Sequence, residues 1–233
     1  MIAREGLPFI LIGLALTILA VWMATRFDSK SLLIFGSLFA LLTCFTAFFF
    51  RDPERQFEMS ENIIISPADG KVIGIETAKS HPFLQGDGVK VSIFLNVFDV
   101  HVNRVPATGK IDYVKYNPGK FFAAFEEKAS ELNEQTEIGM TATHGQRIVF
   151  KQIAGLIARR IVCKLKEGDS VTAGERFGLI RFGSRTELFL PSNTELRIKV
   201  GDRVVGSQSI IGKLPEHSPA RPTASMEQSR ERL

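Results

Sequence analysis

Residues 63–75 read Ile-Ile-Ile-Ser-Pro-Ala-Asp-Gly-Lys-Val-Ile-Gly-Ile, which is two short β-branched runs separated by a turn. β-Branched residues favour strands, whereas Pro, Asp and Gly favour turns. The alternation continues downstream, with strand-like runs at 89–95, 147–150, 179–182, 187–190 and 196–200. Short runs bounded by turn residues predict a mainly β domain.

Two turns in this region resemble each other, namely Gly168-Asp169-Ser170-Val171 and Gly201-Asp202-Arg203-Val204. Gly-Asp supplies a tight turn, and the following Val begins or closes a strand. Such turns recur in the hairpins of biotinyl and lipoyl carrier domains. Two similar β-turns and a true duplication are both compatible with the pattern. We therefore expect a β-rich α+β fold, barrel- or sandwich-like, with biotinyl/lipoyl-like hairpin turns.

Two stretches within the β region carry helical patterns. Residues 122–133 are rich in Ala, Glu and Lys, and residues 153–165 place apolar side chains on one helical face. Both patterns predict short helices.

Upstream of the β region, the composition is that of membrane-spanning helices. Residues 7–25 and 31–50 contain no charged side chain, and a bilayer core of about 30 Å needs about 20 apolar helical residues. The short link 26–30 makes them a helical hairpin. A cleaved signal peptide is the alternative for the first run, but a second run follows at once and no small-residue cleavage site precedes it. We expect residues 1–55 to form a two-helix membrane anchor.

Charge and cysteine content narrow the class of protein. The formal net charge of +4 suits an anionic lipid surface, and it equally suits an ordinary solvated surface. No Lys/Arg cluster predicts nucleic-acid binding. Cys44 and Cys163 are interpreted as small buried hydrophobes, and no Cys/His spacing predicts a metal site. Residues 213–233 are rich in Ser, Pro, Glu and Arg, so we expect a disordered tail.

One histidine stands out as a candidate for chemistry. His101 lies in a strand-like run that also carries Asp99 and Asn103, and alternate residues of a strand share one face. A structural role and a catalytic role are both open for His101. The turn at 66–72 contains Asp69, which is either a turn residue or a carboxylate that orients a histidine.

The pair Gly183-Ser184 is distinguished by its surroundings. Gly36-Ser37 and Gly206-Ser207 also occur, but Gly183-Ser184 lies between two strand-like runs with little turn chemistry around it. Glycine adopts backbone geometries that other residues resist, and so permits local strain.

Five segments together resemble the short bacterial and archaeal phosphatidylserine decarboxylase proenzymes. In chain order they are FFFRDPER at 48–55, SPADG at 66–70, DVHVNR at 99–104, AGLIARRI at 154–161 and RFGSR at 181–185. The resemblance implies a pyruvoyl enzyme that cuts itself between Gly183 and Ser184, giving a β chain of residues 1–183 and an α chain of residues 184–233.

The resemblance also implies roles for the candidate residues. The Ser184 hydroxyl would attack the Gly183 carbonyl carbon, with His101 as base and Asp69 orienting it, as in a Ser-His-Asp triad. Ser184 would become the pyruvoyl cofactor, and no metal is expected. The pyruvoyl ketone would form a Schiff base with the lipid amine and act as the electron sink when CO2 leaves.

Three positions, in two segments, depart from the patterns of related proteins. Arg104 stands where longer bacterial members carry a second histidine, and Thr186-Glu187 replaces a more usual Val-Asp. Two segments have alternative readings. Residues 119–125 either approach the lipid head group or supply core phenylalanines, and Arg159-Arg160 either meets the lipid phosphate or forms a solvated helix face.

The expected function is decarboxylation of phosphatidylserine to phosphatidylethanolamine by a domain spanning residues 56–212. We expect the cell (inner) membrane, with the catalytic domain on the cytoplasmic side. The expected partners are phosphatidylserine and the two chains of one precursor; a homo-oligomer is compatible with the sequence. An archaetidylserine or related serine-phospholipid decarboxylase would need the same chemistry. A non-enzymatic, membrane-anchored lipoyl-like adaptor would instead remain one intact chain.

Overall fold

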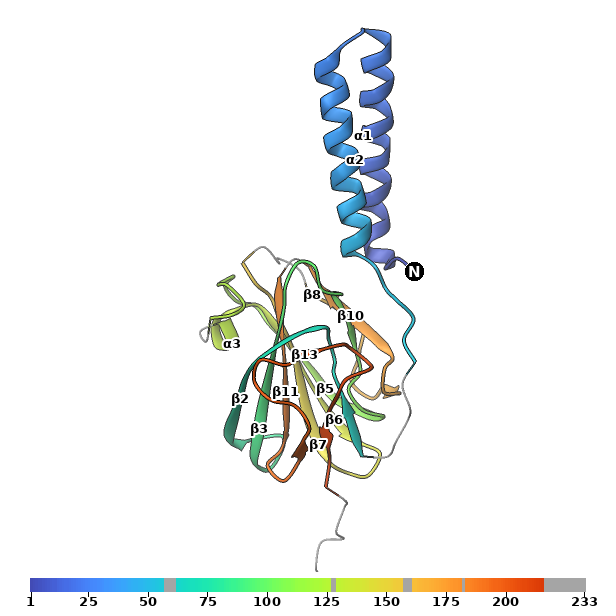
Figure 1. The fold of residues 1–233 in the computed structure, drawn as a ribbon. Helices are drawn as coiled ribbons and strands as arrows, with labels where there is room; N and C mark the ends of the chain where they lie inside the picture. The colour runs from blue at the N-terminus through green and yellow to red at the C-terminus, as the bar shows by residue number, and fades with distance from the viewer. Residues whose placement is uncertain (57–61, 127–128, 157–160, 182, 216–233) are drawn as a thin grey trace, which may run out of the picture.

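The computed structural model describes residues 1–56, 62–126, 129–156, 161–181 and 183–215. Two long helices stand on a β domain (Figure 1). After a 3-10 turn, η1 (Arg4–Gly6), they are α1 (Leu7–Arg26) and α2 (Lys30–Phe49). Both are long and apolar enough to cross a membrane. Most of their side chains are exposed, so they are not the core helices of a soluble domain.

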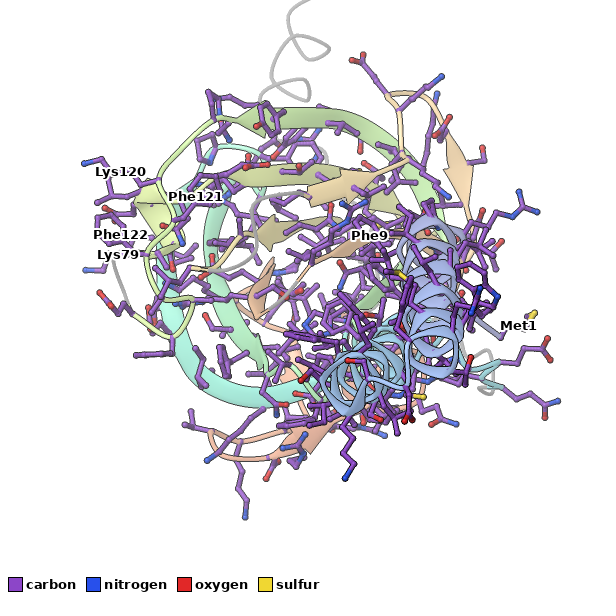
Figure 2. All side chains as sticks on the ribbon, turned by 90° about the horizontal axis from the view of Figure 1, so that it is seen from above. Met1, Phe9, Lys79, Lys120, Phe121 and Phe122 are labelled. Carbon is purple, nitrogen blue, oxygen red and sulfur yellow. The ribbon has the colours of Figure 1, made fainter. Side chains whose placement is uncertain are left out.

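The largest sheet has eight strands, all paired antiparallel with their neighbours. Their spatial order is β13 (Arg203–Val204), β2 (Gly70–His81), β3 (Gly86–Leu95), β11 (Ser184–Pro191), β7 (Arg147–Ile153), β6 (Gln135–Ala142), β5 (Gly109–Asn117) and β9 (Ser170–Val171). Seen from above, the strands curl around a filled interior, and the hairpin stands over one side of it (Figure 2). This arrangement confirms the predicted β-rich fold and the N-terminal helical hairpin.

Two three-stranded sheets and a short helix complete the β domain. One sheet has the order β1 (Ile63–Ile65), β14 (Ile210–Lys213), β12 (Glu195–Leu196). The other has the order β4 (Val102–Arg104), β10 (Arg176–Ile180), β8 (Ile161–Cys163). The short helix is α3 (Ala129–Leu132). In Figure 1, β8 and β10 lie at the end of the domain that faces the hairpin.

The core explains why alternate residues of β11 differ in character. Leu188 and Leu190 are fully buried in the main hydrophobic cluster. Because side chains alternate between the two faces of a strand, Ser184 and Thr186 share the inward face with these leucines. The start of β11 therefore turns polar atoms toward the interior, whereas its later part closes the apolar core.

The two Gly-Asp turns occupy equivalent places in the fold. Gly168 and Gly201 both have positive φ, 90° and 98°. Their amides donate to Ile111 and Val72, respectively, at 2.8 Å each. Each turn leads into a two-residue strand, β9 or β13, at opposite ends of the large sheet. Equivalent pairing at both ends favours duplication over two unrelated turns.

Three sequence expectations need correction. Within 122–133, only Ala129–Leu132 is helical among the described residues, and 153–165 contains the end of β7 and all of β8. Tertiary pairing in the sheet has overridden the helical pattern. Cys44 is exposed on α2 instead of buried, because the hairpin turns most of its surface outward.

The ordered β domain extends beyond the expected limit at residue 212. Strand β14 runs to Lys213, and Leu214 is buried and donates its amide to the Asn62 carbonyl. The rest of the expected tail, 216–233, lies outside the described residues.

Candidate active site

The Gly183-Ser184 junction lies between β10 and β11, at the start of β11. Gly183 has φ of +69°, a left-handed conformation that L side chains rarely adopt. Ser184 is the first residue of β11, pairs with Leu95 of β3, and has no exposed surface. Its Oγ makes no hydrogen bond within the described part of the chain. The serine hydroxyl is therefore fixed in place by the backbone while remaining free for chemistry.

Gly155 packs directly against the carbonyl of this junction. A Cβ atom added to Gly155 would lie 2.1 Å from the Gly183 carbonyl oxygen. That distance is far below van der Waals contact, so only glycine fits. The sequence places Gly155 in a distinctive segment but gives it no role. The close approach shows that it shapes the surroundings of the Gly183 carbonyl.

His101 reaches the same junction from the residue before β4. The Gly183 amide donates to His101 Nε2 at an N···N distance of 3.3 Å. The other ring nitrogen, Nδ1, lies 3.0 Å from the Asp99 carbonyl oxygen. Because that oxygen can only accept, Nδ1 carries the proton and Nε2 presents a lone pair. The backbone of Asp99 thus sets the tautomer that a general base requires.

Burial makes His101 a neutral base. Only 2% of its surface is exposed, and burial lowers its pKa to about 4. The hydrogen bond to the Asp99 carbonyl and the negative charge of Asp69 raise the pKa, whereas the positive charge of Arg51 lowers it. Desolvation disfavours the imidazolium more than these contacts favour it, so the ring is neutral at pH 7.

Asp69 lies near His101 but is engaged elsewhere. Its two carboxylate oxygens accept from Arg55 at 2.5 and 2.8 Å, and one also accepts from the Gly206 amide at 2.8 Å. Thr108 has the same place before β5 as Asp69 has before β2, and its hydroxyl accepts a hydrogen bond from the Ala173 amide at 3.1 Å. The structure therefore places His101 at the junction that contains Ser184. Asp69 instead lies in a turn and pairs with Arg55. Asp69 influences His101 through its charge.

Leu95 of β3 lies directly opposite Ser184, and three buried polar side chains lie on or next to β11 and β7. Asn103, Gln152 and Thr186 have no exposed surface. Gln152 Nε2 donates to Asn103 Oδ1 at 2.8 Å, and Thr186 and Gln152 face each other across β11 and β7. The sequence predicted that Asn103 and His101 lie on one polar, half-exposed strand face, whereas both side chains are buried and His101 precedes β4. The sequence indicated no role for Gln152.

A buried ion pair lies on the opposite face of β11. Arg185 Nη2 and Glu187 Oε1 are 2.9 Å apart, and both side chains are almost fully buried. Ser92 accepts from Arg185 at 2.7 Å, and Ser130 donates to Glu187 at 2.7 Å. Because each charge is paired and hydrogen-bonded, the pair can remain ionised in the interior. It anchors β11 immediately after Ser184.

The charged segment after α2 connects the hairpin to this site. Arg51 donates to the Phe98 carbonyl at 2.6 Å. Asp52 binds Arg104, the residue at the position of the second histidine in longer proteins, and also Arg176 at 3.2 Å. With the Arg55–Asp69 pair, the sequence motif at 51–55 is explained by contacts that dock the hairpin onto the β domain.

The remaining expectations have mixed outcomes. Phe121 packs partly buried against Ala154 and Ile180, whereas Phe125 is 65% exposed. Figure 2 shows Phe121 and Phe122 on the side of the domain away from the hairpin. The prediction for Arg159-Arg160 lies outside the described residues. Among the residues that the structure describes, no cluster of His, Cys, Asp and Glu could hold a metal ion.

This chain is similar to known proteins over most of its length. Residues 42–212 match a family model described as phosphatidylserine decarboxylase. A protein of Desulfotalea psychrophila is 47% identical over 91% of this chain and 96% of its own length, and one of Syntrophus aciditrophicus is 49% identical over the same shares. A Rickettsia africae protein is 47% identical over 90% of this chain and 89% of its own. All three are named phosphatidylserine decarboxylase proenzyme.

Proposed function

Because the chain belongs to the phosphatidylserine decarboxylase family of carboxy-lyases, we propose that it converts phosphatidylserine to phosphatidylethanolamine with a pyruvoyl group made from Ser184. One observation carries the proposal. The Ser184 hydroxyl, which has no hydrogen-bond partner among the described residues, follows a left-handed Gly183 beside a neutral His101 whose Nε2 already touches the Gly183 amide. This places a nucleophile, a peptide bond at a conformation that favours glycine and a base together.

Self-cleavage begins with the serine hydroxyl. His101 Nε2 removes the proton from Ser184 Oγ as the oxygen attacks the Gly183 carbonyl carbon, and the amide becomes an ester. The existing bond from the Gly183 amide to Nε2 is long for a hydrogen bond, so it is easily exchanged for a bond to the hydroxyl. A buried, neutral imidazole with a fixed tautomer suits this transfer.

Elimination then separates the chains. Loss of the Ser184 α-proton expels the Gly183 carboxylate and leaves a dehydroalanine at position 184. Water replaces its nitrogen, which departs as ammonia, and a ketone remains. The products are a β chain of residues 1–183 and an α chain of residues 184–233.

The surroundings of Ser184 fit a pyruvoyl group. The side chain is fully buried, and Leu95 of β3 lies directly opposite it. A ketone there is shielded from bulk water. The pyruvoyl carbonyl supplies an electron sink for the carbanion left when CO2 departs. His101 is the proposed proton donor and acceptor, and Asp69 is proposed to stabilise its charged form across space, because the Asp69 carboxylate raises the pKa of His101.

We propose that residues 1–55 anchor the enzyme in the cell (inner) membrane, with the β domain on the cytoplasmic side. The hairpin and the site lie at the same end of the β domain: Phe49, at the end of α2, contacts His101. A phospholipid head group at the bilayer surface would therefore lie close to Ser184. Tethering enzyme and substrate to one surface raises their effective concentration.

The experiment is lipid conversion by purified full-length protein in vesicles containing phosphatidylserine. We expect phosphatidylethanolamine to accumulate with wild-type protein and not with Ser184→Ala. Ser207→Ala is the matched control, because Gly206-Ser207 is another buried Gly-Ser pair of the same domain. Equal conversion by Ser184→Ala and wild type would refute the proposal.

A further inference from the structure

The last residue of α2 lies inside the candidate active site. The ring centroids of Phe49 and His101 are 4.2 Å apart, and the ring planes are inclined by 36°. Phe49 is 1% exposed. The same helix is one of the two candidate membrane spans. A single residue therefore belongs both to the hairpin and to the wall around the imidazole.

Phe49 is held by apolar contacts from two directions. It packs in a cluster with Val100, Val102 and Leu179. Val100 and Val102 lie on either side of His101 in the sequence, and Leu179 belongs to β10. Phe50 meets it edge-on at 5.0 Å. The chain entering η1 closes the other side, because the Ala3 amide donates to the Phe50 carbonyl at 2.7 Å.

Ion pairs fix the same junction. Asp52, three residues after Phe49, contacts Arg104 of β4 and Arg176 of β10. Arg176 also pairs with Glu5 of η1. All of these side chains are at most 20% exposed, so they are screened less than surface pairs. The end of α2 cannot shift without disturbing both the apolar cluster and this network.

We propose that Phe49 is a positioning residue for His101, so that the membrane hairpin forms one wall of the active site as well as tethering it. The ring covers one face of the imidazole, excludes water from it and limits its rotation. This inference rests on the proposed function, because it concerns the base that activates Ser184.

Phe49 should also affect the pH at which His101 becomes protonated. The charged groups acting on His101 are Arg51, beyond the end of α2, and Asp69, in the turn before β2. The Asp99 carboxylate is paired with Arg203 at 2.5 Å. None of these changes when Phe49 is replaced by leucine, whereas water gains access to the ring. Because desolvation is the largest cause of the lowered pKa of His101, that pKa should rise toward 6.5.

The test compares self-cleavage of newly synthesised full-length chains in vesicles across a pH series. For Phe49→Leu we expect the acidic midpoint of the cleavage rate to rise by about one pH unit. Phe50→Leu is the matched control: it removes a buried aromatic ring from the same cluster, and Phe50 stacks on Phe9 and meets Phe49 edge-on. We expect its midpoint to equal that of wild type.

A second measurement does not depend on cleavage. Nitrogen-15 histidine labelling of the Ser184→Ala chain follows the titration of His101 directly, with and without Phe49→Leu. A higher His101 pKa in the double variant supports the inference. Equal midpoints and equal His101 titration in the Phe49 and Phe50 variants would overturn it while leaving the proposed function intact. A wild-type chain that never cleaves would instead refute the proposed function, and the titration would still decide the role of Phe49.

Discussion

Replacing Gly155 with alanine should block self-cleavage without unfolding the protein. The added Cβ would lie 2.1 Å from the Gly183 carbonyl oxygen, whereas close carbon–oxygen contacts begin at about 3.3 Å. One of the two backbones must therefore move by about 1 Å. Both are constrained, because Gly155 follows β7 closely and Gly183 precedes β11. A misplacement of this size costs on the order of 100-fold in rate.

The assay is the time course of conversion from one chain to two, followed by gel electrophoresis of newly synthesised protein. Gly86→Ala is the control, because a Cβ at Gly86 meets nothing within 4 Å and its φ is ordinary. We expect Gly155→Ala to cleave about 100-fold more slowly than wild type and Gly86→Ala to match wild type. Cleavage of the two alanine variants at the same rate would refute the claim that Gly155 shapes the scissile carbonyl.

Three further predictions concern charge. Self-cleavage needs neutral His101, whose pKa is about 4. The rate of cleavage should therefore stay constant from pH 8 to about 5 and fall to half near pH 4. A midpoint of the cleavage rate near 6.5 would instead show an unperturbed imidazole. Asp69→Asn removes a charge that raises the pKa of His101, and this weakens the base. Stopped time courses should therefore show slower cleavage at pH 7, and an unchanged rate would exclude the electrostatic role. Glu187→Ala leaves Arg185 buried without its ion-pair partner, so chemical denaturation should show that the free energy of unfolding falls by about 3–5 kcal/mol. A double variant, Arg185→Met with Glu187→Leu, should recover much of this stability. No recovery would count against the ion-pair explanation.

The sequence predicted the parts of the fold that depend on local composition. Charge-free runs of about twenty residues predicted the hairpin, because each run is as long as a helix that crosses a bilayer core. β-Branched runs between turn residues gave the strands. The helical pattern at 153–165 was misleading, because pairing of β8 with β10 is a tertiary effect that periodicity does not contain.

Only those parts of the candidate site that depend on the chemical character of single residues could be predicted from the sequence. Ser184 and His101 carry chemically distinctive side chains, and the structure brings them together. Gly155 and Phe49 have no reactive group, and their importance lies in distances across the fold. The partner of Asp69 was also unpredictable, because Arg55 reaches it from the segment that leaves the membrane hairpin.

Self-cleavage should break the bond between Gly183 and Ser184 and leave a carbonyl group at position 184. Intact-mass measurement of purified wild-type protein, with and without a carbonyl-trapping reagent, tests it directly. The account predicts a β chain ending at Gly183 and an α chain lighter than a serine-ended chain by one ammonia, which gains the mass of the reagent. A catalytically active preparation consisting of one uncleaved 25.9 kDa chain that does not react with the reagent would contradict it.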